Sequence, residues 1–520
     1  MTSIMLVIPP HGYKRGIMPL TLGDCPMGPP YLVRPLQAEG HTVYGLNVNN
    51  IRGYDSPSEM LAGELRCALY HYQPDVVGLG GLCTDYAAIR DSIAIVRKFA
   101  PNTKIVVGGG IINNDRVYAP QILGADQYVI GDGEIGLPHA LNEQAGMIDG
   151  GTQTSLDSFA FPNLDLFGVH GMLEASPYVR YIYRYTRPKP RVMSLVASRG
   201  CVFQCTFCTD HRRSYRARSI LNLMAEIKEK VEKYEPNIFI LLDELFAITP
   251  DRVRDFSEGI IEGQEKWGWD FDWAFQTHAS ARLDEETLKL AKRAGCYMVV
   301  YGLESASPDV LDSIGKHSKP EQIVELVEKT DRLKIAYSGN IIVGDPAEKT
   351  QTVRESIRFW NKHLRDTHVF FGAIRPYPGA KVFADYFGDQ TLGQRQSYYE
   401  HIDERLFNMT KLPDFIWLPW ANLAAWLGDK FPWVKVAKLG KCPHCGATVA
   451  DNAAPCVSKM LKTPFHVLRH RVRLALCLVL SFWHPLYREL MPLWGDAFGA
   501  TITGCLSCGK RVAIHCEKAK

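Results

Sequence analysis

The chain has 520 residues, of which 46% are hydrophobic and 22% are charged, and its formal net charge is only +3. These proportions are typical of a folded globular protein, and the length predicts about three domains. The near balance of charge gives no reason to expect nucleic-acid binding by the chain as a whole. The apolar start is too short for a signal-peptide core, and no run approaches the roughly 20 apolar residues of a membrane span. We therefore expect a cytoplasmic protein.

Residues 1–150 alternate short apolar strands with helical segments. Helices are predicted at residues 31–39 and 87–99. Strands are predicted at residues 3–8, 42–46, 75–79, 104–107 and 127–130. This alternation is typical of a parallel, doubly wound α/β sheet of the Rossmann-like type, in which ligands bind beyond the carboxyl ends of the strands.

Glycine-rich turns follow three of these strands, at residues 80–81, 108–110 and 131–133. A tight turn can require glycine for conformational reasons alone. Because parallel strands end at one edge of a sheet, three such turns favour a ligand site there. The candidate binding residues at this edge are Thr84, Gly108, Gly109, Gly110, Gly131 and Gly133.

The middle of the chain begins with a connector and continues as a second α/β unit. Residues 151–190 lack a clear period and contain four prolines, so we predict a connector there. From residue 191 to 400, strands are predicted at 193–197, 238–242, 272–275, 298–301, 336–343 and 368–374. Six strand–helix units predict a partial (β/α)6 barrel with site residues at the carboxyl ends of its strands.

Three cysteines follow the first strand of the predicted barrel: Cys201, Cys205 and Cys208. A short loop can bring three thiolates to one 4Fe–4S cluster, which leaves the fourth iron open for a substrate or cofactor. The alternatives are a zinc site that lacks a ligand, and chance. The C-x3-C-x2-C spacing, with Phe207 just before the third cysteine, favours the cluster.

This motif resembles that of the radical S-adenosylmethionine (SAM) superfamily, and four later segments resemble the family in the same order: residues 240–246, 301–305, 339–350 and 375–379. The resemblance implies that the open iron binds the methionine part of SAM and that reductive cleavage yields a 5′-deoxyadenosyl radical. It implies SAM contacts from Asp243, Glu244, Gly302, Glu304, Ser305 and Gly344.

The residues at these positions also have structural alternatives. Asp243 and Glu244 could be charges at the end of a strand, and Glu304 could form a structural salt bridge. The segment at 339–350 departs from the family pattern, because Asp345 and Ala347 stand where leucine and glycine are usual. No residue is assigned a catalytic role.

Residues 1–150 resemble the cobalamin-binding domain of one group of radical SAM enzymes, through segments 28–32, 37–41, 75–79, 106–110 and 124–134. The D-x-H-x-x-G motif of many cobalamin proteins is absent, because Pro9 and Lys14 flank His11 at its Asp and Gly positions. The resemblance therefore implies cobalamin without a histidine on cobalt. The alternative is a domain that has lost this cofactor.

Residues 401–520 differ in character and carry two C-x-x-C-G pairs, formed by Cys442, Cys445, Cys505 and Cys508. These resemble the knuckles of a zinc ribbon, in which four thiolates close a tetrahedral site. An auxiliary iron–sulfur cluster and unligated cysteines are the alternatives. Residues 434–520 contain 13 Lys/Arg and 4 Asp/Glu, a balance of +9. This basic segment with apolar residues predicts peripheral membrane contact or, alternatively, a docking helix.

Four functions are compatible with these features. The first is a cobalamin-dependent radical methylase that acts on an unactivated carbon or phosphorus of a small-molecule, lipid or peptide substrate, with an electron donor such as a flavodoxin or ferredoxin. The second is a cobalamin-assisted radical cyclase or rearrangement enzyme. A nucleic-acid-modifying radical enzyme is disfavoured by the acidic remainder of the chain, and a non-catalytic metal-bearing scaffold by the intact three-cysteine motif.

Overall fold

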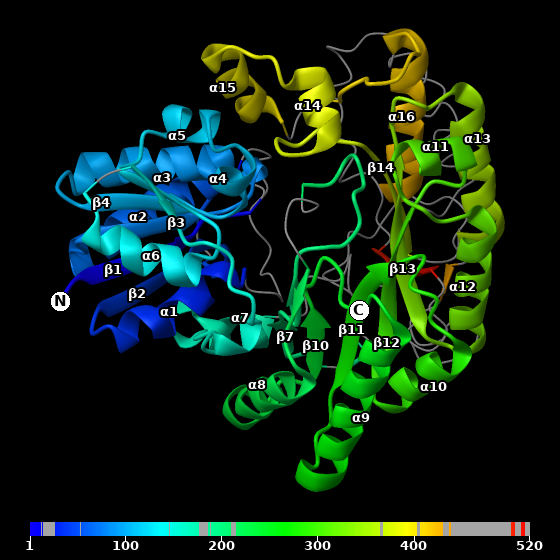
Figure 1. Cartoon of the computed structure of the whole chain (residues 1–520), viewed down its shortest axis with the longest axis horizontal. Helices are drawn as coiled ribbons and strands as arrows, with labels where there is room; N and C mark the ends of the chain where they lie inside the picture. The colour runs from blue at the N-terminus through cyan, green and yellow to red at the C-terminus, as the bar shows by residue number, and fades with distance from the viewer. Residues whose placement is uncertain are drawn as a thin grey trace, which may run out of the picture.

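The computed structural model describes residues 1–11, 13, 26–51, 54–144, 146–175, 186–187, 189–209, 215–364, 368–402, 406–429, 436–437, 501–504 and 511–514. Two six-stranded parallel sheets dominate this part of the chain (Figure 1). The predicted α/β class is therefore confirmed. Within the described ranges, no helix combines the length and the apolar character needed to cross a membrane.

The first sheet has the strand order β2-β1-β3-β4-β5-β6. Its strands are β1 (Ser3–Ile8), β2 (Thr42–Asn47), β3 (Val76–Gly80), β4 (Lys104–Gly108), β5 (Gln127–Ile130) and β6 (Gly146–Asp149). All neighbouring pairs are parallel. Because β2 and β3 lie on opposite sides of β1, the direction of the chain along the sheet reverses there, which opens a crevice at the carboxyl edge.

Helices cover both faces of this sheet. They are α1 (Gly28–Ala38), α2 (Pro57–Tyr72), α3 (Tyr86–Phe99), α4 (Gly110–Asn114), α5 (Tyr118–Leu123) and α6 (Gly133–Asn142). Successive residues of β1 alternate between two cores: Ile4 and Leu6 pack with α1 and α6, whereas Met5 and Val7 pack with α2 and α3. This period of two places both faces of the strand in apolar surroundings, as a buried parallel sheet requires.

Several elements of the first unit are absent from the sequence predictions: the helices α2, α4, α5 and α6 and the strand β6. Helix α2 has a clear local signal, since the Ser56 side chain accepts a hydrogen bond from the Glu59 amide and Pro57 is the first helical residue. Strand β6 has no such signal. It is an edge strand whose residues are mostly exposed, so it needs no apolar run.

The second sheet is an open half-barrel with the order β14-β13-β12-β11-β10-β7. Its strands are β7 (Val192–Leu195), β10 (Ile238–Leu241), β11 (Asp272–His278), β12 (Cys296–Glu304), β13 (Ala336–Val343) and β14 (His368–Ala373). All six predicted strands are confirmed. The helices that follow them are α8 (Ile220–Tyr234), α9 (Pro250–Trp267), α10 (Glu285–Arg293), α11 (Pro308–Ser313), α12 (Pro320–Arg332) and α13 (Thr350–Phe359).

Segments outside the sheets join them. In the predicted connector, α7 (Val169–Ala175) contributes Met172 and Leu173 to a core that continues from α1 to α8. After the half-barrel, α14 (Lys381–Phe387) and α15 (Leu392–His401) share the core of the first sheet with α3 and α5, and α15 lies above this sheet in Figure 1. Helix α16 (Asp414–Asp429) lies against β14 and α13. The domain boundaries stay a prediction.

A small sheet with the order β15-β17-β16 comprises β15 (Val436–Ala437), β16 (Thr501–Gly504) and β17 (Arg511–Ile514). The four cysteines of the predicted zinc ribbon lie outside the described residues.

Candidate functional site

A cavity of about 1560 Å³ lies at the carboxyl edge of the first sheet. Five of the six candidate glycine-edge residues line it: Gly108, Gly109, Gly110, Gly131 and Gly133. Thr84 is not among the lining residues, although its neighbours Leu82 and Asp85 are. The cavity exceeds the roughly 300–1,000 Å³ of ordinary small-ligand sites. It therefore suits a cofactor that is larger than a simple metabolite.

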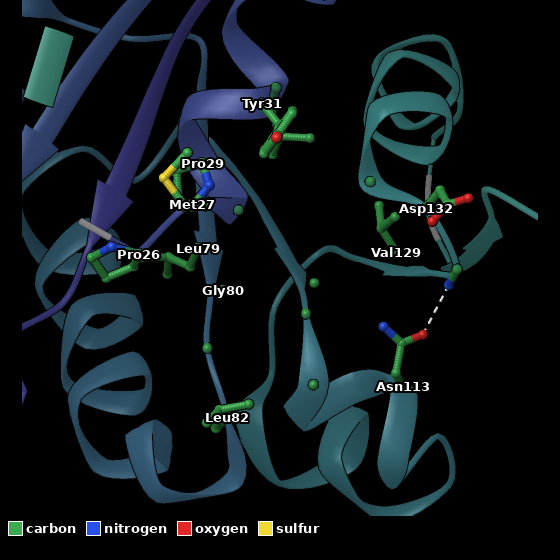
Figure 2. A pocket seen from close by; sticks show the side chains of 18 of the residues that line it. Pro26, Met27, Pro29, Tyr31, Leu79, Gly80, Leu82, Asn113, Val129 and Asp132 are labelled. Atoms are coloured by element: carbon green, nitrogen blue, oxygen red, sulfur yellow. Dashed lines mark hydrogen bonds between the residues drawn. The ribbon is translucent and has the colours of Figure 1, made fainter. Parts of the chain in front are cut away.

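The turns after β3, β4 and β5 form the floor of this cavity (Figure 2). Leu82 is 60% exposed and stands among these glycines as a large apolar side chain. Asn113 accepts a hydrogen bond from the Gly131 amide at 2.8 Å, the dashed line in Figure 2, which holds the turn after β5. Sequence reasoning did not assign a role to Leu82 or Asn113.

The glycines at this edge fall into two groups. Gly131 has a φ of +77°, and a Cβ there would lie 2.2 Å from the Gly151 carbonyl oxygen, so the fold requires glycine whatever the ligand. At Gly80 and Gly108 the nearest atoms to a Cβ would be 3.4 Å and 3.5 Å away, which is ordinary contact. Packing therefore does not demand glycine at Gly80 and Gly108, and their missing side chains leave the cavity open.

The same cavity reaches the second sheet. Ser198, Arg199, Thr209, Leu242 and Glu244 line it from the ends of β7 and β10 and from the segment that carries the three cysteines. The glycine-rich edge of the first sheet thus faces the predicted cluster site.

The cysteine loop starts from a short antiparallel pair of strands, β8 (Ser198–Arg199) and β9 (Arg216–Ala217). Backbone hydrogen bonds fix its centre: the Thr206 amide donates to the Ile314 carbonyl, and the Val382 amide donates to the Thr206 carbonyl, both at 3.0 Å. Phe207 packs on Val310, Leu311 and Ile314. The loop is therefore positioned by segments that lie more than a hundred residues away in the chain.

The three cysteines form a suitable donor set for a cluster. Cys205 is buried, and its pKa is raised, first by burial and further by the charges of Glu304 and Cys201. In the part of the chain that the structure describes, no three His, Cys, Asp or Glu side chains converge closely enough to hold a single metal ion. A four-iron cluster does not need that convergence, because each cysteine binds a different iron.

Four charged side chains connect the two sheets beside the cavity. Asp132 belongs to the turn after β5 and Glu134 to the first turn of α6, and Arg199 and Arg216 flank the cysteine loop. Arg216 donates to Asp132 Oδ2 at 2.7 Å, and Arg199 lies 3.2 Å from Asp132 Oδ1 and also pairs with Glu134. Asp132 and Glu134 are buried, and only 9% of the Arg216 side chain is exposed. We call these four residues the inter-sheet ion cluster.

The paired carboxylates at the end of β10 have different surroundings. Asp243 is buried, and its Oδ1 accepts the amides of Ala197 and Ser198 at 2.7 Å each, which ties β10 to the end of β7. Burial is the main cause that raises its pKa to about 7. Glu244 is exposed, lines the cavity and accepts the Gly200 amide at 3.3 Å. The geometry therefore gives Asp243 a structural contact and leaves Glu244 facing the cavity.

Glu304 forms the salt bridge that sequence reasoning kept as its alternative. Its Oε1 lies 3.0 Å from Lys316 Nζ, and both side chains are buried. A Cβ on Gly302 would approach that Nζ within 2.6 Å, so this glycine makes room for the pair. Ser305 is buried and lies 3.3 Å from the Ser356 hydroxyl.

Gly344 is placed away from this pair. It has a φ of +108°, and a Cβ there would lie 3.2 Å from the Trp417 ring of α16. Its contacts with SAM, like those of the other five residues, stay predictions.

Comparison with known proteins decides the nature of the half-barrel, because residues 195–359 match the Radical SAM superfamily. The chain contains a radical SAM domain. An uncharacterized methyltransferase of Pyrococcus horikoshii is 29% identical over 192 residues, which cover 36% of this chain and 40% of that protein. The anaerobic magnesium-protoporphyrin IX monomethyl ester cyclase of Rubrivivax gelatinosus is 25% identical over 361 residues, 64% of this chain and 62% of the cyclase. The chain spans about half the length of the curated relatives it matches.

Solved structures share the fold over about three quarters of the chain. The radical SAM methyltransferase TsrM from Kitasatospora setae, with cobalamin and a [4Fe-4S] cluster bound, has a TM-score of 0.56 at 16% identity and covers 73% of each chain. The cobalamin-dependent radical enzyme OxsB has a TM-score of 0.55 at 17% identity and covers 78% of this chain and 56% of OxsB. At these identities the likeness shows the fold.

The site also contains residues that sequence reasoning missed. Lys316 had no local signal, because its partner Glu304 lies 12 positions earlier and across a strand end. The inter-sheet ion cluster had a partial local signal in the sequence. Asp132 and Glu134 stand next to the glycines 131 and 133, and Arg199 directly precedes the Gly200-Cys201 pair. Their pairing could not be predicted, because it joins residues about 65 positions apart. His278, at the end of β11, was also missed.

Proposed function

We propose that the chain is a cobalamin-dependent radical SAM methylase that acts on an unactivated carbon or phosphorus centre. One observation carries this proposal: the side-chain-poor cavity of the first sheet extends to the loop of Cys201, Cys205 and Cys208. That arrangement would place a large cofactor of the first sheet next to a cluster in the radical SAM domain. We propose accordingly that the first sheet is a Rossmann-like cobalamin-binding domain.

In this mechanism the cofactors, when bound, supply a methyl group and a radical that abstracts hydrogen from the substrate. The chain's own residues hold and separate them. Cys201, Cys205 and Cys208 would bind the cluster, and the glycine turns would let a large ring approach the backbone. Apolar lining residues such as Leu79 and Leu82 would exclude water from the space between the sheets. The inter-sheet ion cluster would hold the two cofactor sites in fixed positions relative to each other.

Product stoichiometry tests the methylase. With its true substrate and a strong reductant, the anaerobically reconstituted protein should form S-adenosylhomocysteine and 5′-deoxyadenosine in roughly equal amounts, together with methylated product. Formation of product and 5′-deoxyadenosine without S-adenosylhomocysteine would reject methyl transfer. The substrate class, a small molecule, lipid or peptide, and the electron donor, a flavodoxin or ferredoxin, are part of this proposal.

A cobalamin-assisted cyclase or rearrangement enzyme is the second candidate. The observation that favours it is the similarity to the ester cyclase, which extends over 64% of this chain. Such an enzyme would share the cavity, the cysteine loop and the ion cluster. The same stoichiometry experiment distinguishes the two candidates.

We further propose that Cys442, Cys445, Cys505 and Cys508 bind one structural zinc ion. The strands next to these positions support the proposal, because β16 ends directly before Cys505 and pairs in antiparallel fashion with β17, which follows Cys508. A C-x-x-C-G pair between two paired strands could direct two thiolates to one ion. Elemental analysis of a variant that lacks Cys201, Cys205 and Cys208 should find one zinc and little iron, whereas substantial iron would indicate an auxiliary cluster.

Peripheral membrane contact by the tail is a separate proposal. Residues 434–520 carry a balance of +9, and each basic residue near an anionic leaflet contributes about 1 kcal/mol. Co-sedimentation with anionic vesicles, stronger at low than at physiological salt, is the expected result. The absence of binding in both conditions would leave the docking-helix interpretation.

A further inference from the structure

His278 is a buried side chain directly beneath the cysteine loop. It is the last residue of β11, and only 6% of its surface is exposed. Its ring stacks on Phe203, with the ring centroids 3.7 Å apart and the planes within 14°. Phe203 lies between Cys201 and Cys205. The imidazole therefore forms part of the support on which the loop rests.

The hydrogen bonds of His278 determine its tautomer. The Ser280 amide, which can only donate, donates to Nδ1 at 3.1 Å, and the Ser280 hydroxyl lies 2.7 Å from the same atom. Nδ1 must therefore be unprotonated, and the proton of the neutral ring is on Nε2. The ring is neutral because burial, followed by the charges of Lys316 and His317, lowers its pKa to about 3.

The Nε2–H group is consequently a buried donor without an acceptor among the residues that the structure describes. Leaving such a donor unsatisfied costs about 1–3 kcal/mol, so a native structure rarely keeps one without a reason. The neighbouring charges place this donor beside the cysteine loop. Lys316 acts electrostatically both on His278 and on Cys205, and its partner Glu304 also acts on Cys205.

We propose that His278 donates its Nε2–H to an anionic acceptor at the cluster site: a sulfur of the cluster, or the carboxylate of the SAM molecule bound to it. This inference deepens the proposed function and rests on it. It makes His278 a cofactor-binding residue that local sequence patterns do not mark. A donated hydrogen bond would stabilise whichever group carries negative charge there.

The substitution His278→Phe isolates the N–H group, because phenylalanine keeps the ring, its burial and its stacking on Phe203. His278→Gln retains an N–H donor and should keep most of the effect. Ser194→Ala is the matched control, since it removes another buried polar group without a partner among the described residues, a hydroxyl on β7 of the same sheet. Iron content and thermal melting of each holoprotein establish that the variants have folded and loaded.

Two measurements distinguish the acceptors. If the acceptor is a cluster sulfur, His278→Phe should shift the EPR signal of the reduced cluster without SAM and disfavour reduction about tenfold, a fall of about 59 mV for one electron. If the acceptor is the SAM carboxylate, the SAM-free cluster should be unchanged and the Kd of SAM should rise about tenfold. A fully loaded His278→Phe protein with wild-type values in both measurements would overturn the proposal.

The wild-type protein provides a test that needs no variant. With 15N-labelled histidine, pulsed EPR of the reduced cluster with SAM bound should detect a weak histidine nitrogen coupling, and its absence would also overturn the inference. Failure of the wild-type protein to assemble a cluster at all would be a different result, because it contradicts the proposed function itself.

Discussion

The carboxyl edges of the two parallel sheets are built in opposite ways. At the first edge, the turns after β3, β4 and β5 are glycine-rich and leave a cavity of about 1560 Å³. At the second, the ends of β10, β11 and β12 carry buried polar side chains, among them Asp243, His278 and Glu304. The first edge leaves room for a bulky ligand because it lacks side chains. The second edge carries polar groups that can contact small, charged ligands.

The two edges also differ in how well their buried polar and charged groups are paired. At the first edge, the buried carboxylates of Asp132 and Glu134 are neutralised by Arg199 and Arg216 of the β8–β9 pair. At the second edge, burial raises the pKa of Asp243 to about 7, and the Nε2 of His278 is left without a partner among the described residues. Ligands bound there would relieve part of this cost, which is typical of functional sites.

Removal of the three thiols of the cysteine loop should have the largest effect, because it abolishes the proposed cluster site at the second edge. A variant with Cys201, Cys205 and Cys208 replaced by alanine should lose iron–sulfur absorbance and all reductive cleavage of SAM, because no other described group replaces three thiolates. Cys67→Ala, at an exposed position, is the control. The assay is anaerobic formation of 5′-deoxyadenosine, and its persistence in the triple variant would contradict a cluster at this loop.

The inter-sheet ion cluster should show the next largest effect. Asp132→Asn leaves two arginines without their shared carboxylate, and for a buried pair this costs about 3 kcal/mol of unfolding free energy. Burial raises the pKa of Asp132, but the hydrogen bonds from Arg216 and Gln153 and the charges of both arginines outweigh burial and lower it.

The sign of the pH dependence follows from that lowered pKa. The stabilisation is fully present above the unfolded pKa of about 3.9 and is lost as pH falls through the folded pKa. Denaturant unfolding should therefore separate wild type from Asp132→Asn near neutral pH and bring them together below about pH 4. A constant difference down to pH 3 would refute the ionic origin.

A larger side chain at the glycine-rich first edge should weaken cofactor binding there. Gly80→Leu has room for its Cβ, so the larger side chain extends into the cavity instead of displacing the backbone. Overpacking of about 1–3 kcal/mol would weaken cobalamin binding about 10- to 100-fold. Gly171→Leu, where a Cβ meets open space, is the control. Absorbance of bound cobalamin per chain gives the affinity, and unchanged retention in Gly80→Leu would place the cofactor elsewhere.

The smallest effect is expected at Asp243. Because its folded pKa lies above the unfolded value of about 3.9, the native state holds the proton more tightly, and stability falls as pH rises from about 4 to 7. The slope is at most about 1.4 kcal/mol per pH unit. Asp243→Asn keeps an acceptor for the two backbone amides but does not titrate.

Unfolding free energies at pH 5 and pH 7 should therefore differ less in Asp243→Asn than in wild type. The comparison must be made between the two proteins, because Glu348, whose pKa burial also raises to about 7, adds a slope of the same sign to both. Equal slopes would show that Asp243 is ionised in the folded protein.

Elements with a strong local pattern could be predicted from the sequence. The half-barrel strands contain apolar runs, such as Ile238–Leu241 and residues 297–301, which parallel strands need because both of their faces are buried. The cysteine loop is equally local, since its three thiols lie within eight residues. The exposed edge strand β6 lacks such a run and escaped prediction.

The sequence by itself determined the two α/β units, the candidate cluster ligands and the glycine turns, because each depends on neighbouring residues. Only the tertiary structure decided that the glycine edge opens toward the cysteine loop, that Glu304 pairs with Lys316, and that His278 lies under Phe203. These relations join residues 12 to about 75 or more positions apart, and spacing along the chain does not record them. The physical reason is that strand order and packing bring such distant side chains together, whereas local patterns report only burial and backbone conformation.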